Sequence, residues 1–170
     1  MIIVKLRSLL LLAVPCALAF AAGCATSAAH PSPAAGLSLR PVSNDVEQAY
    51  LAYWDAWLKA NATSNPKEPS LARHAISPQL DVLRANLTAA RQRNQVTRGA
   101  VGHRLQGMES DSGASRVVDC IDLDKWLFYD ATSGRRIDQL IDKPSQLAIF
   151  TLRPWNQTWR VSDSRVIGEC

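Results

Sequence analysis

The feature that most constrains the fold is a change of hydrophobic pattern at Asn94. From residue 44 to residue 94 the apolar side chains recur every three or four residues, which is typical of amphipathic helices. From Val96 to Glu169 they lie in short segments separated by turn residues, which is typical of strands. Helices followed by closely connected strands predict an α+β domain. We expect the amino-terminal helices to pack on a curved antiparallel sheet.

The first helix is predicted over residues 44–62, where Ser43 or Asn44 is a suitable N-cap and acidic residues occupy the first turn. Its apolar stripe consists of Val46, Tyr50, Tyr53 and Trp57. A second helical segment is predicted over residues 70–94, with Ser77 as the cap and Pro78 at the first helical position. The predicted strands are residues 96–110, 115–130, 146–154 and 158–169, joined by turns at 112–113, 133–134 and 155–156.

The amino terminus has the three-part layout of a secretory signal peptide. Lys5 and Arg7 precede an apolar run from Leu9 to Ala22, and this run of 14 residues contains Pro15. A transmembrane helix needs about 20 apolar residues, so the run is too short to span a bilayer. We therefore assign residues 1–23 to a signal peptide.

The residues AAGC at 21–24 resemble the lipobox of bacterial lipoproteins. In that family the cysteine thiol is lipidated and cleavage makes the cysteine the new amino terminus, which implies acylation of Cys24 and a lipid bilayer as partner. The alternative is cleavage at an ordinary signal site nearby, because leucine more often stands where Ala21 does. Residues 24–43, rich in small residues and proline, are then predicted to be a flexible tether, and residues 44–170 a single domain.

Charge argues against a nucleic-acid partner. Removal of residues 1–23 takes away Lys5 and Arg7, so the formal net charge falls from +4 to +2. A nucleic-acid-binding domain is normally strongly basic. We therefore expect no nucleic-acid partner.

The signal peptide and the lipidated cysteine predict an extracytoplasmic protein that is anchored to the cell membrane by lipid.

The cysteines support that location. Cys16 leaves with the signal peptide and Cys24 is used by the lipid, which leaves Cys120 and Cys170. Two cysteines outside the cytoplasm predict one disulfide between them. The alternative is a reactive thiol pair, but the chain has no C-x-x-C spacing to support it.

Taken in order, the helices and strands resemble the nuclear-transport-factor-2-like superfamily, also called SnoaL-like or cystatin-like. The resemblance rests on AYLAYW at 49–54, VDCID at 118–122, TSG at 132–134, WRV at 159–161 and the terminal Cys170. More narrowly, the chain is similar to uncharacterised actinobacterial lipoproteins and mammalian-cell-entry-associated proteins. The resemblance implies a cone-shaped domain over residues 44–170. This fold hosts isomerases, epoxide hydrolases and polyketide cyclases as well as domains without chemistry.

Enzymes of this superfamily use carboxylates and tyrosines inside the cone. The weak catalytic candidates are therefore Asp55, Asp119 and Tyr53, and the further candidates are Asp122, Tyr50 and His103. A buried aspartate with a raised pKa would be suited to act as a base near neutral pH. None of these residues lies in a recognisable catalytic motif, so no catalytic residue is assigned.

The aromatic residues of the first helix have two interpretations. Tyr50, Tyr53 and Trp57 are candidates for lining a pocket that takes a small apolar ligand. The other interpretation, which we favour, is core packing, and both can hold because the inner face of such a helix can be core at one end and cavity at the other. No histidine or cysteine spacing indicates a metal site, and no glycine-rich loop indicates a nucleotide cofactor, so neither is expected.

The sequence therefore predicts a non-enzymatic accessory domain of the cell envelope that binds an envelope protein or a small apolar ligand. The alternative is a small-molecule isomerase, cyclase or hydrolase with an aspartate base and a tyrosine in the cone cavity.

Overall fold

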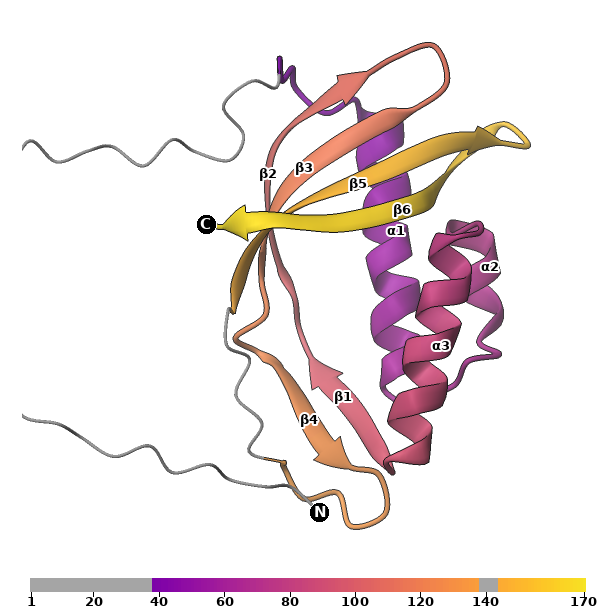
Figure 1. The fold of residues 1–170 in the computed structure, drawn as a ribbon, viewed down its shortest axis with the longest axis vertical. Helices are drawn as coiled ribbons and strands as arrows, with labels where there is room; N and C mark the ends of the chain where they lie inside the picture. Colours follow the sequence, from indigo (N-terminus) through magenta and orange to yellow (C-terminus); the bar gives the residue numbers. More distant parts are fainter. Residues whose placement is uncertain (1–37, 138–143) are drawn as a thin grey trace, which may run out of the picture. The chain divides into compact units, whose positions relative to one another are not determined.

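The computed structural model describes residues 38–137 and 144–170. The predicted signal peptide, Cys24 and most of the predicted tether lie outside the described residues. Figure 1 shows the elements, which are α1 (Asn44–Asn61), α2 (Pro69–His74), α3 (Gln79–Gln92), β1 (Gln95–Gly99), β2 (Gly102–Ser110), β3 (Ser115–Asp122), β4 (Trp126–Asp130), β5 (Ser145–Trp155) and β6 (Thr158–Glu169). In these two ranges no helix has the length and apolar character needed to cross a membrane.

The helices form where the periodic pattern predicts them. Ser43 is the N-cap of α1, with acidic side chains in the first turn and Lys59 in the last, both favourable to the helix dipole. The second predicted segment is two helices, because α2 ends at His74 and α3 begins at Gln79. Pro78 is the N-cap of α3 and not its first residue.

The strands are all antiparallel and form two sheets. The larger has the order β2-β3-β5-β6, and the smaller pairs β1 with β4. Figure 1 shows the three helices on one side of the strands and the β1–β4 ribbon leaning away from the larger sheet. The domain is therefore α+β, as predicted.

Two predicted strands are each broken in the structure, because the chain bends between the two sheets. Gly99 ends β1 with a φ of +115°. A Cβ at this position would lie 1.8 Å from the carbonyl oxygen of Lys125, which immediately precedes β4. Only glycine tolerates both this dihedral angle and this approach, so the bend depends on Gly99.

Alternation along β3 gives the larger sheet two buried faces. Val117 and Ile121 pack into the main core beneath the helices, together with Tyr50 and Phe150. Val118 and Cys120 belong to a smaller cluster with Leu147 and Ile149. Asp119 shares the phase of Val117 and Ile121, so it points toward the helices.

The packed part of the chain begins before the predicted boundary at residue 44. Arg40 pairs with Met108 of β2 through two backbone hydrogen bonds of 2.8 and 3.0 Å. Leu39 packs against the smaller cluster and Val42 against the main core. Gly107 makes this possible, because a Cβ there would lie 2.9 Å from the carbonyl oxygen of Arg40.

The predicted disulfide is confirmed. Cys120 of β3 is bonded to Cys170, the last residue of the chain, across a sequence separation of 50 residues. Since β6 ends at Glu169, the bond ties the chain end to the centre of the larger sheet.

Candidate functional site

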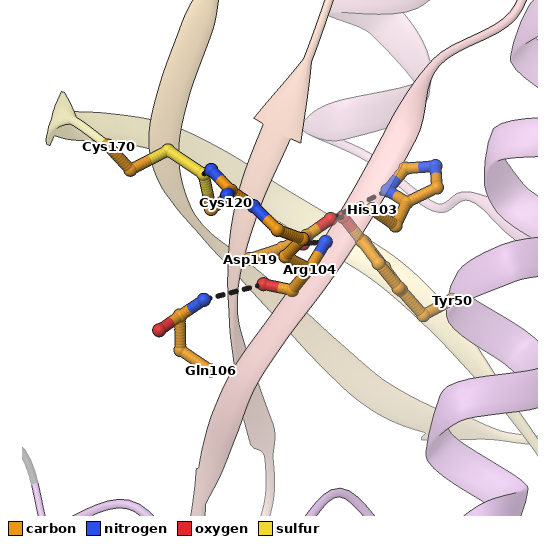
Figure 2. Close-up of a disulfide and its surroundings, with 7 residues drawn as sticks. All are labelled: Tyr50, His103, Arg104, Gln106, Asp119, Cys120 and Cys170. Carbon is orange, nitrogen blue, oxygen red and sulfur yellow. Dashed lines mark hydrogen bonds and ion pairs between the residues drawn. A yellow bond between two sulfur atoms is a disulfide. The ribbon is translucent and has the colours of Figure 1, made fainter.

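Three donors converge on the carboxylate of Asp119, which is 0% exposed (Figure 2). The Tyr50 hydroxyl donates to Asp119 Oδ2 over 2.7 Å, and His103 Nδ1 lies 2.6 Å from the same oxygen. The backbone N–H of Arg104 donates to Asp119 Oδ1 over 2.8 Å. Tyr50 comes from α1 and the other two residues from β2, so this cluster ties the helix to the sheet.

The surroundings of the cluster are apolar and aromatic. The Tyr50 ring contacts Phe150 at a centroid distance of 5.0 Å and His103 at 5.6 Å. Burial raises the pKa of Tyr50 well above its usual range, and the neighbouring Asp119 carboxylate raises it further. Tyr50 therefore remains a neutral donor at physiological pH.

Asp119 is fully buried and lines none of the four concavities described among residues 38–137 and 144–170. A general base must reach the proton that it abstracts, directly or through one water. Asp119 is instead occupied by protein donors and closed off by core side chains. Arg104 is exposed, and the half-buried His103 lines an open depression of about 460 Å³ beside Val42 and Leu105. The hydrogen bonds of the cluster therefore join α1 to β2 and β3, which is a structural role.

The other carboxylate candidates lie apart from this cluster. Asp55 is exposed on α1, and Asp122 is exposed at the end of β3. The structure therefore brings one candidate aspartate, Asp119, together with one candidate tyrosine, Tyr50. It separates both from Asp55.

A groove lies between the helices and the larger sheet, with a volume of about 220 Å³. We call it the α1–α3 groove. Its aromatic lining comes from α1, β4 and β5, and its polar groups come from α3, β5 and β6. The residues that define it are Tyr53, Trp54, Trp57, Gln79, Val82, Leu83, Asn86, Ile121, Leu123, Trp126, Gln146, Ala148, Phe150, Ser164, Arg165 and Val166. Of the three predicted pocket residues, Tyr53 and Trp57 line this groove, and Tyr50 is buried outside it.

Three of the polar side chains in the groove are hydrogen-bonded to one another. Gln79 Nε2 donates to the Tyr53 hydroxyl over 2.7 Å, and Ser164 Oγ donates to Gln79 Oε1 over 3.1 Å. Burial raises the pKa of Tyr53 well above its usual range, so this hydroxyl is neutral and serves as an acceptor. The indole N–H of Trp126 is buried and has no hydrogen-bond partner among the described residues. The indole N–H of Trp54, which also lines the groove, is likewise buried without a hydrogen-bond partner among the described residues, so the groove offers two indole donors on a mostly apolar wall.

The rim of the groove combines two exposed valines with the exposed polar side chains of Asn86 and Arg165. Val82 of α3 is 50% exposed and Val166 of β6 is 57% exposed, and both line the groove. Large exposed apolar side chains that flank a concavity are a common property of binding grooves. This arrangement is suited to holding a small apolar body.

Several of these residues were missed at the sequence level. Gln79 and Trp126 carry no local signal, because their place in the groove depends on how α3 and β4 pack. The pairing of His103 with Asp119 had a partial signal, since both residues lie in segments of alternating pattern. Within residues 38–137 and 144–170, no group of three or more histidine, cysteine or acidic side chains is arranged to hold a metal ion.

Comparison with known proteins informs the fold. No protein-family model and no curated protein sequence matches the chain. The intermembrane-space region of the chloroplast protein ARC6 aligns with a TM-score of 0.60 at 8% identity, over 76% of this chain and 99% of that structure. A domain of unknown function with a cystatin-like fold from Nostoc punctiforme aligns with a TM-score of 0.46 at 9% identity, over 76% and 80% of the two chains. At 8% identity, the likeness to the ARC6 region concerns the fold alone.

Proposed function

We propose that this chain is a membrane-anchored extracytoplasmic lipoprotein whose folded domain, a nuclear-transport-factor-2-like cone, binds a small apolar ligand in the α1–α3 groove without transforming it. The observation that carries the proposal is the groove itself. It has aromatic walls, exposed valines on its rim and two unpartnered indole donors among the described residues, those of Trp54 and Trp126. Such a site matches an apolar molecule with one or two hydrogen-bond acceptors.

We propose binding without catalysis because Asp119 is not placed to act as a base. Its two oxygens are taken by Tyr50, His103 and the backbone of Arg104, and it lines none of the described grooves. A base in use would need a free lone pair directed at a substrate. The groove itself holds Gln79 and Ser164, which are already hydrogen-bonded to one another.

The anchor is proposed from the lipobox-like residues 21–24, with acylated Cys24 in the bilayer. The disulfide between Cys120 and Cys170 supports an oxidising compartment outside the cytoplasm. Replacement of Cys24 by serine is expected to move the protein from the membrane fraction to the soluble fraction and to abolish incorporation of a labelled fatty acid. Continued labelling of the Cys24→Ser protein would contradict the anchor.

Ligand binding can be tested with a neutral apolar probe, N-phenyl-1-naphthylamine, whose fluorescence rises in apolar surroundings. The protein is the chain from residue 24 onward carrying Cys24→Ser, so that no acyl chain competes for the groove. Val82→Glu places a charge on the rim and is expected to weaken probe binding about tenfold, equivalent to about 1.4 kcal/mol. The matched control is Ala85→Glu, on an exposed position of the same helix that does not line the groove. Equal effects of the two variants, or no binding by the parent protein, would contradict the proposal.

An envelope protein is the other occupant to consider for the exposed valine rim. Crosslinking in the native membrane fraction separates this case, because a protein partner would be captured by the parent chain and lost with Val82→Glu.

The second candidate function is a small-molecule isomerase, cyclase or hydrolase. The observation in its favour is the pair of Asp119 and His103, because a carboxylate that orients a surface-accessible imidazole is a known arrangement for a base. The depression beside His103 contains no hydroxyl or thiol nucleophile among its lining residues. A turnover that is lost in a folded His103→Gln protein would favour this candidate over simple binding.

A further inference from the structure

A second concavity lies beside the first turns of α1 and shares no lining residue with the α1–α3 groove. It has a volume of about 570 Å³ and is closed by the end of α2 and the start of β6. We call it the basic pocket, because Arg73, His74 and Arg160 all line it.

Arg160 is the best-positioned of these cations. Its Nη1 donates to the carbonyl oxygen of Ala72 over 2.9 Å, and its guanidinium lies over the Trp155 ring at 5.7 Å from the centroid. Its Nε is buried and has no hydrogen-bond partner in the part of the chain that the structure describes. A buried charged donor without an acceptor is costly, so this position favours a ligand that brings one.

The charges around the pocket are predominantly positive. His74 faces Arg73 and Arg160, and burial lowers the pKa of His74 first, with the two arginines lowering it further. Asp55 acts in the opposite direction. None of the described acidic side chains lies within ion-pair distance of Arg73 or Arg160.

Asp45 is the one carboxylate on the pocket wall, and it is already engaged. Its Oδ2 accepts a hydrogen bond of 2.7 Å from the indole N–H of Trp159. The hydrogen bond from Ser43 is the main cause that lowers the pKa of Asp45, and the bond from Trp159 lowers it further. The wall between these groups is apolar, because Ala49 and Ala52 of α1 present small side chains to the pocket.

We propose that the basic pocket binds a small organic carboxylate, with its anionic group held by Arg73, His74 and Arg160 and its apolar body against Ala49 and Ala52. A planar guanidinium matches a carboxylate through two parallel hydrogen bonds, and Arg160 lines the pocket. The alanines leave room for a ring or short chain next to the anion. This site is independent of the proposed apolar groove.

Calorimetric titration with benzoate tests the proposal, using the chain from residue 24 onward with Cys24→Ser. Benzyl alcohol has the same ring without the charge and is expected to bind about tenfold more weakly or not at all. Inorganic phosphate supplies the charge without the ring and is also expected to bind more weakly. If benzyl alcohol or phosphate binds as well as benzoate, the proposed ligand class is wrong.

The variants assign the site. Arg160→Gln is expected to weaken benzoate binding about tenfold or more. Arg153→Gln is the matched control, because Arg153 is the cross-strand partner of Arg160 but does not line the pocket. Arg73→Gln provides a second test at an exposed position that carries little folding risk. Equal effects of Arg153→Gln and Arg160→Gln would overturn the proposal, whereas Val82→Glu should leave benzoate binding unchanged.

The pH dependence gives a separate signature. A bound carboxylate favours protonated His74, so the pKa of His74 measured by NMR should rise when benzoate is added. Affinity should increase as the pH falls through that pKa, and His74→Gln should remove this dependence. A His74 pKa that does not move with benzoate would place the anion elsewhere and contradict the proposal.

Discussion

Replacement of Asp119 by alanine tests the interpretation of the buried cluster most directly. The substitution leaves the Tyr50 hydroxyl and the Arg104 N–H without their acceptor, and it frees His103. A buried donor without a partner costs about 1–3 kcal/mol. Tyr50 is fully buried and carries the whole cost, whereas His103 and Arg104 are nearer the surface and gain water. We therefore expect a loss of about 1–3 kcal/mol in the free energy of unfolding, the cost of this one unpaired donor.

The assay is urea unfolding of the oxidised protein, followed by tryptophan fluorescence. Asp163→Ala is the control, because Asp163 is an exposed acid on β6 and should cost less than about 0.5 kcal/mol. Tyr50→Phe alone should cost about 1 kcal/mol, the net value of one hydrogen bond.

The double variant makes the reasoning specific. Tyr50→Phe removes the donor that Asp119→Ala would leave unpaired. The double variant should therefore lose less free energy of unfolding than the sum of the two single losses. If Asp119→Ala costs no more than Asp163→Ala, or if the losses of Tyr50→Phe and Asp119→Ala add fully, the cluster is not the tie between helix and sheet that we infer.

Three further predictions concern stability. Replacing Cys120 and Cys170 together by alanine should lower the free energy of unfolding by about 4 kcal/mol, the chain-entropy value for a loop of this length, and an unchanged urea midpoint would contradict it. Gly99→Ala should destabilise by about 1–3 kcal/mol, because the new Cβ meets the carbonyl oxygen of Lys125 at an unfavourable φ; a loss below about 0.5 kcal/mol would show that the bend tolerates a side chain. Because burial and a neighbouring carboxylate raise the pKa of Tyr50 above its unfolded value near 10, the stability it contributes is complete below that pH and falls as the pH rises further. Urea midpoints measured between about pH 9 and pH 11 should therefore fall less steeply in Tyr50→Phe, and an identical slope would refute the assignment.

Local patterns predicted much of the fold. The stripe through Tyr50 and Trp57 and the cap at Ser43 located α1, because helix periodicity and capping act within a few residues. The pairing of Cys120 with Cys170 followed from compartment and count alone. These inferences needed no knowledge of how distant segments meet.

The errors arose where long-range contacts decide the structure. The segment around Gly99 looks like continuous strand, and its break depends on the close approach of Lys125. Likewise, the residues before 44 look like a tether until the carbonyl of Arg40 meets Gly107. A glycine in an alternating segment was the available signal in both places, but it does not identify the partner that approaches.

The candidate site was harder to predict for the same reason. Asp119 pairs with His103 only because of the register between β2 and β3, which shifts at the bulge between Leu105 and Gly107. A shift of one residue would turn His103 to the opposite face. Asp55 was predictable as exposed, since it lies off the helical stripe that contains Tyr53 and Trp57.

Helix α1 connects the three sites, and this makes one variant informative about all of them. Ala49 and Ala52 line the basic pocket, and Tyr53 and Trp57 line the α1–α3 groove. On the same helix, the Tyr50 hydroxyl donates a hydrogen bond to Asp119. If Asp119 only fixes the helix to the sheet, a folded Asp119→Ala protein should lose stability while it still binds both the neutral probe and benzoate. If Asp119 belongs to a catalytic or binding site, ligand affinity or turnover should fall by more than the fraction of unfolded protein explains. Titrating both ligands at urea concentrations well below the unfolding transition separates these outcomes, because the folded fraction is then near one in every variant.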